Sequence, residues 1–384
     1  LILFEGRYVF RSRRQPGQVE GGATYQSFLI RNWRGFDSSC FLPGTNVAIR
    51  DAVLTVNCST PTTWAALALE RDAAVLQGSS AIEVSNQLHW SSGRIAGAST
   101  AQTFTLANGA SALFDGPGPL PMSRVLDNRR FDNHGAILIS NGNWTAIDNG
   151  AQLTNHTDGQ IVVNAQPTDT SSWSSNTPAS SLFTNAGLLQ LVQVNDSVIN
   201  PRFVNTGTVN ITQGTLWLTQ GGTDTGTYTV SASGTLVIDG LDANRTLATV
   251  GAINGLGRLN LFNSSVLNTQ GVLSVAEVNV GGGSDLVLQS TTPVSLDKVG
   301  LTGGTISGSA EVRIKNQMSW STGTISGNGP TPGPFRILPG GVLDAIGDVT
   351  RSLQRRALQI EGTLNYHEGE LNTPAGETGV IDVR

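Results

Sequence analysis

Short stretches in which apolar and polar residues alternate recur along this chain, and each is opened by a glycine. Examples are Gly135–Ile139, Gly187–Leu191, Gly207–Ile211, Gly214–Leu218, Gly234–Ile238, Gly257–Leu261 and Gly362–Tyr366. Alternation with a period of two predicts β-strands that bury one face. The stretches return about every twenty residues, which is too long for a hairpin repeat and too short for a βαβ unit.

This period predicts an all-β protein, a right-handed parallel β-helix (β-solenoid) with coils of about 20 residues. Each coil supplies short strands and stacks on the coil before it. At a strand spacing of about 4.8 Å, 17–19 coils would form a rod roughly 80–90 Å long.

A second pattern, Phe-x-Asn-x-Gly, supports the same fold. It occurs at Phe131–Gly135, Phe183–Gly187 and Phe203–Gly207. We expect the Phe to fill the interior, the Asn to occupy a corner and the Gly to supply a positive φ. Asparagines that stack from coil to coil can form a hydrogen-bonded ladder along the rod.

Residues 63–76 are the one stretch with helical propensity, because alanine and leucine favour helices and Thr63 could cap one. The apolar residues Leu67, Leu69 and Val75 also fit a period of two. Since the coils that follow keep this rhythm, we predict strands here.

A longer repeat overlies the short one. Trp90–Gly97 returns as Trp320–Gly327, and each copy is followed by Pro-Gly-Pro and by an arginine pair, 129–130 and 355–356. The super-repeat is about 230 residues long. We divide the chain into residues 1–50, an arginine-rich N-terminal cap or docking segment, and residues 51–384, the solenoid rod. The missing N-terminal methionine suggests a processed or excerpted product.

Composition narrows the classes of function. Charged residues make up 13% of the chain and the net charge is −5, so no basic face for nucleic acid is expected. No apolar run is long enough for a membrane span. The four histidines are dispersed and two cysteines cannot build a zinc site. Gly221–Asp224 lacks the spacing and tandem recurrence of a calcium-binding repeat, so we predict neither a metal site nor a cofactor.

The two cysteines, Cys40 and Cys58, are 18 residues apart, close to one coil. Residues one coil apart stack at about 4.7–4.9 Å, within the Cα separation that a disulfide tolerates. We predict a disulfide between neighbouring coils, with two free buried thiols as the alternative. A disulfide would indicate an oxidising, extracellular compartment.

The Trp-Ser-x-Gly-x-Ile-x-Gly phrase, the Asn-x-Gly-x-aliphatic coils and the low charge resemble the β-helices of large bacterial surface proteins. Filamentous-haemagglutinin-like adhesins and autotransporter passengers are the families in question, and the resemblance covers residues 80–384. It implies an extracellular, mostly non-catalytic rod used in adhesion or surface coating.

Parallel β-helices also host polysaccharide lyases and glycosidases, which need carboxylates on one solvent-facing wall. The best local cluster is Asp127, Asp132 and His134, where Asp132 and His134 would share a face of an extended strand. A corner with solvated charges is the simpler interpretation. Trp173, in a Ser/Thr-rich segment, is the aromatic residue we expect in a loop that contacts a ligand.

The sequence therefore predicts an extracellular structural protein rather than an enzyme. It would be an adhesin stalk joined to the remainder of a larger surface protein, or a subunit that assembles head to tail with itself. A phage- or pilus-associated rod that binds carbohydrate or a cell-surface ligand is another alternative. Assembly would use the exposed strand edges at the two ends of the rod, at Leu1, Ile2, Leu3, Phe4, Val380, Ile381 and Val383.

Overall fold

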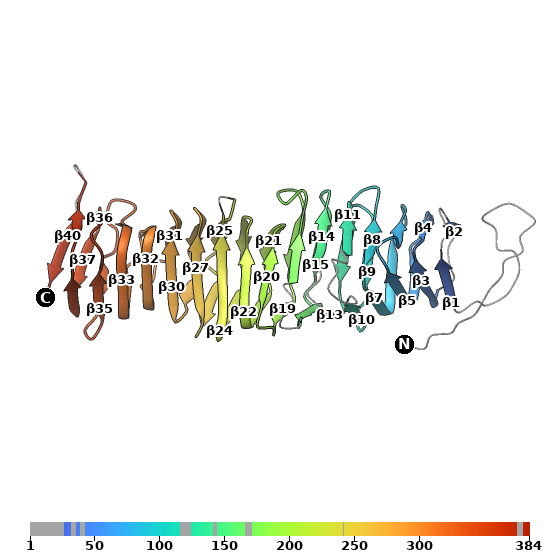
Figure 1. Ribbon diagram of the computed structural model, residues 1–384, viewed down its shortest axis with the longest axis horizontal. Helices are drawn as coiled ribbons and strands as arrows, with labels where there is room; N and C mark the ends of the chain where they lie inside the picture. Colours follow the sequence, from blue (N-terminus) through green and yellow to red (C-terminus); the bar gives the residue numbers. More distant parts are fainter. Residues whose placement is uncertain are drawn as a thin grey trace, which may run out of the picture.

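The computed structural model describes residues 27–31, 36–38, 43–115, 124–140, 144–165, 171–240, 242–374 and 379–384. Short strands stack side by side into one straight rod, with β1 toward one end and β40 at the other (Figure 1). The described residues form no helix, and their strands pair in parallel. The predicted all-β parallel solenoid is thus confirmed, whereas its right-handed winding stays a prediction.

The strands of the N-terminal third are β1 (Ser27–Arg31), β2 (Phe36–Ser38), β3 (Thr45–Arg50), β4 (Val53–Val56), β5 (Thr62–Glu70), β6 (Val75–Gln77), β7 (Ile82–Trp90), β8 (Gly93–Ala96), β9 (Thr103–Leu106), β10 (Ser111–Phe114), β11 (Arg124–Asp127), β12 (Arg130–Asn133) and β13 (Ala136–Ile139). The middle third contains β14 (Trp144–Asp148), β15 (Gln152–Asn155), β16 (Gln160–Val163), β17 (Ser171–Ser174), β18 (Leu182–Asn185), β19 (Leu188–Leu191), β20 (Asp196–Ile199), β21 (Arg202–Asn205), β22 (Thr208–Leu218), β23 (Gly222–Asp224), β24 (Thr227–Asp239), β25 (Asn244–Leu247) and β26 (Ala252–Gly255). The C-terminal third contains β27 (Arg258–Phe262), β28 (Val266–Thr269), β29 (Val272–Ser274), β30 (Glu277–Gly281), β31 (Asp285–Leu288), β32 (Val294–Gly308), β33 (Val312–Ser326), β34 (Phe335–Ile337), β35 (Val342–Ala345), β36 (Thr350–Gln354), β37 (Ala357–Ile360), β38 (Thr363–Tyr366), β39 (Glu370–Asn372) and β40 (Val380–Val383).

The rod has about 15 turns with a mean spacing of about 21 residues. At about 4.8 Å per turn this gives a length of roughly 70 Å, less than the 17–19 coils of the sequence estimate require. Some turns are longer than twenty residues, because Phe104 pairs with Phe131 and Leu153 pairs with Phe183. Of the expected cap or docking segment, residues 1–50, residues 1–26, 32–35 and 39–42 lie outside the described residues. Its described strands β1, β2 and β3 pair in parallel with the strands that follow them.

Alternation along each strand builds the core. In β5 the side chains of Thr62, Trp64, Leu67 and Leu69 are buried and most of their neighbours are half-buried. Because parallel pairing keeps the same residue position above its counterpart in the next turn, the inward side chains stack into continuous apolar columns. The prediction of strands rather than a helix at 63–76 is confirmed by β5 and β6.

A ladder of buried asparagines runs along one corner of the rod. Asn133 Nδ2 donates to Asn155 Oδ1 at 2.7 Å, Asn155 Nδ2 to Asn185 Oδ1 at 2.7 Å, and Asn185 Nδ2 to Asn205 Oδ1 at 2.9 Å. Each amide also donates to a backbone carbonyl of a following turn. The four side chains are fully buried, so these bonds supply the partners that buried polar groups require. The Asn ladder expected from the sequence is confirmed, with Asn155 as a further member.

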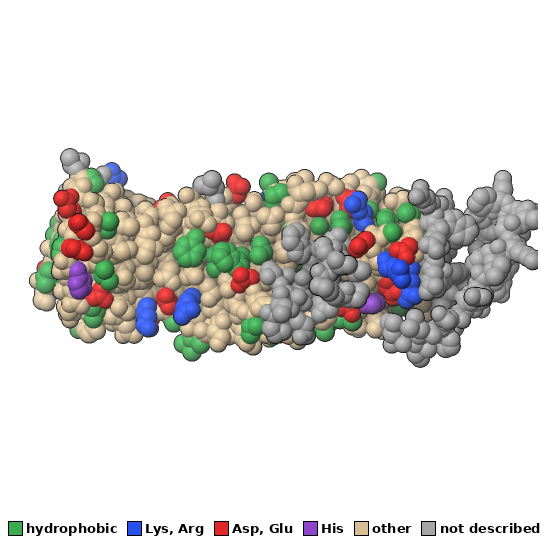
Figure 2. Space-filling model, in the orientation of Figure 1, with side chains coloured by type: hydrophobic (Ala, Val, Ile, Leu, Met, Phe, Trp, Pro, Cys, Tyr) green, Lys and Arg blue, Asp and Glu red, His purple; other side chains and the backbone are tan. Residues whose placement is uncertain are grey.

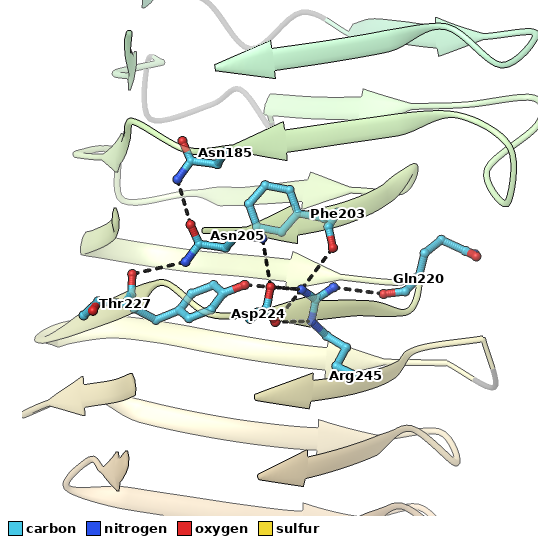
Figure 3. Close-up of polar contacts among 8 residues, drawn as sticks. Asn185, Phe203, Asn205, Gln220, Asp224, Thr227 and Arg245 are labelled. Carbon is cyan, nitrogen blue, oxygen red and sulfur yellow. Dashed lines mark hydrogen bonds and ion pairs between the residues drawn. The ribbon is translucent and has the colours of Figure 1, made fainter. Parts of the chain in front are cut away.

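The ladder ends at a buried ion pair (Figure 3). Asp224 follows Asn205 by one turn, and its Oδ1 accepts the Asn205 backbone N–H at 3.0 Å. Asp224 Oδ2 accepts from Arg245 Nε at 3.1 Å and from its NH2 at 2.6 Å, and the guanidinium also donates to Tyr228 Oη. Burial disfavours the charged guanidinium, but the Asp224 carboxylate outweighs this effect and raises the pKa of Arg245. Burial raises the pKa of Tyr228 well above its usual value.

The two copies of the super-repeat share local geometry. Trp90 Nε1 donates to the carbonyl of Gly93 at 3.3 Å, and Trp320 Nε1 donates to the carbonyl of Gly323 at 3.3 Å. Both indoles are buried and both glycines have a positive φ. In each copy the glycine pairs in register with a buried arginine of the next turn, and these arginines are Arg124 and Arg351.

A second buried arginine follows in each copy, Arg129 and Arg356. The residue before each has a positive φ, 46° at Asn128 and 52° at Arg355, and the chain turns a corner there. The arginine guanidinium then donates to backbone carbonyls of earlier turns, which for Arg129 are those of Ser80, Ala96 and Thr103. Burial lowers the pKa of Arg129 and of Arg356 to about 10. These arginines act as cations that satisfy carbonyls at a corner of the rod.

Replacing the central asparagine of the ladder should destabilise this part of the rod. Asn155→Ala removes the acceptor of Asn133 and the donor of Asn185, and two buried groups without partners should cost roughly 2–4 kcal/mol. Asn268→Ala, at an outward position of β28, is the control and should change stability by less than about 0.5 kcal/mol. Urea unfolding with amide hydrogen exchange of β12, β15 and β18 measures both. Equal stabilities for the two variants would contradict a structural ladder.

The adjacent arginines Arg129 and Arg130 form a matched pair. Arg129→Ala should lower the free energy of unfolding by about 3–5 kcal/mol, because it leaves buried carbonyls without a donor. Arg130 is exposed and pairs with Asp132, so Arg130→Ala should cost at most about 1 kcal/mol. Differential scanning calorimetry compares the two. A larger loss for Arg130→Ala would overturn the role of the buried guanidinium.

Candidate functional site

A cluster of histidines and aspartates lies on the outer wall beside the Asn ladder. Asp132 lies on β12, and His134 follows the strand directly. Phe131 and Asn133 alternate with Asp132 and face the interior, so Asp132 points to the outer wall. Arg130 Nε donates to Asp132 Oδ2 at 2.9 Å, and the Asp132 side chain is only 9% exposed.

The neighbouring turn supplies partners for both predicted residues. His156 Nε2 lies 3.0 Å from Asp132 Oδ1, and His134 Nδ1 lies 2.9 Å from Asp158 Oδ1. The imidazole rings of His134 and His156 stack, with centroids 4.0 Å apart and planes inclined by 11°. Two imidazoles and two carboxylates therefore form a continuous polar cluster across two turns.

The chemistry of this cluster is that of paired acids and bases. The hydrogen bond from His134 lowers the pKa of the Asp158 carboxyl, which favours the carboxylate. Asp158 and both imidazoles are partly exposed. The cluster can thus hold protons at a water-facing surface, and no group of three or more metal-ligating side chains occurs among the described residues.

Asp127 has a separate set of partners. It lies on β11, before the corner at Asn128. Its Oδ2 accepts from Arg94 at 2.8 Å and its Oδ1 accepts from Asn149 at 2.7 Å. The sequence grouped Asp127 with Asp132 and His134. The corner at Asn128 instead separates Asp127, on β11, from Asp132, on β12, and Asp127 pairs with Arg94.

Sequence reasoning missed His156 and Asp158. The sequence Asp132-Asn-His134 is followed one turn later by His156-Thr-Asp158, in which the histidine and the aspartate stand in reverse order. The register of β12 and β15 pairs Asn133 with Asn155, which places the two histidines at equivalent positions. Aligning successive coils on the asparagine would have revealed this pair.

Trp173 requires a correction. We expected it in a loop where it could contact a ligand, but it lies in β17 and its side chain is buried. Its ring packs against Phe183, with centroids 5.6 Å apart. The Ser/Thr-rich flanks suggested a loop, yet the buried Ser171 and Trp173 alternate with half-buried residues, as in β11.

Cys58 is disulfide-bonded. Its expected partner, Cys40, lies outside the described residues, so this pairing stays a prediction. The register agrees with it, because β2 pairs with β4 through Phe36↔Leu54 and Ser38↔Val56. That offset of 18 residues equals the spacing of the two cysteines.

The last described turn leaves interior positions uncovered. In β40, Ile381 pairs with Leu358 and Val383 with Ile360, and both partners are buried core residues. Ile381 is nevertheless 44% exposed and Val383 63% exposed, because no further described turn covers them. Val380 pairs with Ala357 and points outward. Leu1, Ile2, Leu3 and Phe4, the other expected assembly residues, lie outside the described residues.

The exposed surface of the rod carries little charge. On the face shown in Figure 2, uncharged polar side chains and backbone cover most of the area, with acidic groups gathered near the C-terminal end. In the part of the chain that the structure describes, no helix has the length and apolar character needed to cross a membrane.

No protein-family model, curated protein or solved structure matches this chain. The fold and the side-chain geometry are therefore the basis for assigning a function.

The histidine–aspartate cluster gives a pH-dependent prediction. Since its folded pKa is lowered, the Asp158 carboxylate should contribute stability above its unfolded pKa of about 3.9. This contribution is lost as the pH falls through the folded pKa. His134→Ala should return the Asp158 pKa toward its usual value, whereas His89→Ala, which removes the partner of Asp115, should not. Carboxyl-carbon NMR titration measures both, and an unchanged Asp158 pKa in His134→Ala would contradict the assignment.

Proposed function

We propose that this chain is an extracellular structural rod, either the stalk of a larger adhesin or a subunit of a filament that assembles head to tail. The uncovered last turn carries this proposal. Ile381 and Val383, together with Leu364 and Tyr366 of β38, hold interior positions but remain exposed. Burial of such apolar area is the main driving force for association.

The open strand edges at this end of the rod also favour association with another β-solenoid turn. Within the described residues, β38, β39 and β40 each pair with one earlier strand and keep the other edge open. An open edge is a template for another strand. The occupant that satisfies both the edge and the apolar side chains is another β-solenoid turn, from a larger chain in a stalk or from a second copy in a filament.

The disulfide at Cys58 and the scarcity of charge support an extracellular setting. The adhesin part of the proposal rests on the likeness of the coil motifs to bacterial surface β-helices. We assign the rod no catalytic role, because Asp127 and Asp132 are each engaged by an arginine and lie on separate strands. A polysaccharide-cleaving enzyme would need such carboxylates free to face a substrate.

End-to-end assembly can be tested with charges at the last turn. Ile381→Asp with Val383→Asp places two carboxylates at interior positions of the interface, where burial of unpaired charge is strongly unfavourable. Electron microscopy and sedimentation should show filaments for the unmodified chain and single rods for this double variant. Val380→Asp, on the adjacent outward position, is the matched control and should still assemble. Single rods for the unmodified chain at every concentration would favour the stalk, and filaments from the double variant would exclude this interface.

A further inference from the structure

A shallow polar groove on the outer wall of the C-terminal half lies outside every site described above. It has a volume of about 280 Å³ and spans β30, β32 and β33. Its lining consists of Glu277, Asn279, Lys298, Val299, Gly300, Gln317 and Ser319. The volume is near the lower end of the range for ligand sites, about 300–1,000 Å³.

The register arranges these side chains in two rows parallel to the rod axis. Glu277 pairs with Lys298 and Lys298 with Gln317, which gives one row across three turns. Asn279, Gly300 and Ser319 form the second row in the same way. Since successive turns are about 4.8 Å apart, the rows are about 10 Å long.

The missing side chain at Gly300 creates the hollow between them. A Cβ atom at this position would lie 2.4 Å from Asn279 Oδ1, so the Asn279 side chain would have to move to admit a larger residue. Gly300 is not one of the glycines with a positive φ. The local backbone therefore does not demand glycine, and the glycine instead keeps the floor of the groove open.

Intramolecular bonds hold part of the lining in place and leave other groups available. Glu277 accepts from Arg258 at 3.1 Å and from Asn279 Nδ2 at 2.9 Å. Asn279 Nδ2 also donates to Asn260. Lys298 is exposed and forms no ion pair within 4.0 Å with another described residue. Lys298 and Ser319 line the groove, and Asn279 Oδ1 lies beside Gly300. These residues supply the groove with donors and an acceptor.

We propose that this groove binds a neutral, polyhydroxylated ligand, a short saccharide lying along the rod axis. Glu277 and Lys298 are the charged groups of the lining, and Arg258 and Asp344 bond to Glu277 and Gln317 at its two ends. Two positive and two negative groups sum to zero, so the groove selects neither an anion nor a cation. The lining offers both donors and acceptors, which match hydroxyl groups because each hydroxyl both donates and accepts. Fixed polar side chains on rigid strands suit such a ligand, because little ordering accompanies binding. This site does not depend on the assembly of the rod.

Isothermal titration calorimetry of the full chain with cellotetraose, maltotetraose and chitotetraose tests the proposal. We expect at least one to bind with a Kd of about 1 mM or tighter, and raising the salt from 0.05 to 0.5 M should change the affinity less than about twofold, because a neutral ligand is not screened. Lys298→Met and Gly300→Thr should each weaken binding roughly tenfold or more, by removing a donor and by filling the hollow. Lys315→Met, at another exposed lysine on β33, is the matched control and should bind as the unmodified chain does.

Several results would overturn the proposal: no heat of binding with any of the three saccharides at 10 mM ligand, equal loss in Lys298→Met and Lys315→Met, or full binding by Gly300→Thr. Tighter binding of trigalacturonate or acetate than of the neutral saccharides would likewise show a site for anions. Circular dichroism at each variant's working temperature confirms that the rod is folded.

Discussion

Parallel hydrogen bonding between successive turns is the constraint on which the rest of this structure depends. It fixes each residue above its counterpart one turn earlier, at about 4.8 Å. Each side chain therefore contacts the side chains at the same position of the two adjacent turns. Phenylalanine packs on phenylalanine, as Phe183 does edge to face on Phe203, with centroids 5.2 Å apart and ring planes inclined by 75°. An inward polar group finds its partner in a neighbouring turn, as the ladder asparagines do, or within its own turn, as the Trp90 indole does with Gly93.

The rod meets this demand in two ways. In the Asn ladder, each buried side-chain amide bonds to the same amide of the next turn. At the corners, the guanidinium groups of Arg129 and Arg356 donate to buried backbone carbonyls. Both arrangements meet where the ladder ends, because Asp224 accepts from the backbone N–H of Asn205 and from the guanidinium of Arg245. Burying a guanidinium costs desolvation free energy, which several hydrogen bonds to carbonyls offset in part. Arg129 Nε and Arg356 Nε and NH1 are nevertheless buried without a hydrogen-bond partner among the described residues, which agrees with the lowered pKa of both arginines.

Features that recur at a fixed position of each turn could be predicted from the sequence, and these include the Asn ladder that joins turns. Contacts between residues that do not recur could not be predicted. Phe131, Asn133 and Gly135 form a local motif, so the interior position of Phe131 and the corner position of Asn133 could be predicted from spacing alone. The positive φ expected at the motif glycines is wrong, because Gly135, Gly187 and Gly207 have none. Glycine is needed at Gly135 because a Cβ would lie 2.3 Å from the Ala110 carbonyl oxygen of the preceding turn. Asn155 escaped notice because Leu153 stands in place of the motif's Phe and its glycine, Gly159, follows two residues later than in the motif. His134 and His156 are separated by a whole turn, and the length of that turn depends on its loops. Trp173 was wrongly expected in a loop because serine and threonine are common both in loops and on the outward face of a strand. Composition alone does not distinguish the two.

The direction of the Asn ladder has a consequence for how such a rod can change its length. Every amide donates toward the C-terminal end, and the series begins beside Leu106 in the register of β9 and ends at a carboxylate. Turns with purely aliphatic interiors can be added or removed singly by recombination, since one resembles the next. The segment from Asn133 to Arg245 lacks this freedom, because a turn without an asparagine would interrupt the chain of donors. We therefore expect this segment to be kept as one block and length variation among rods of this design to lie on either side of it.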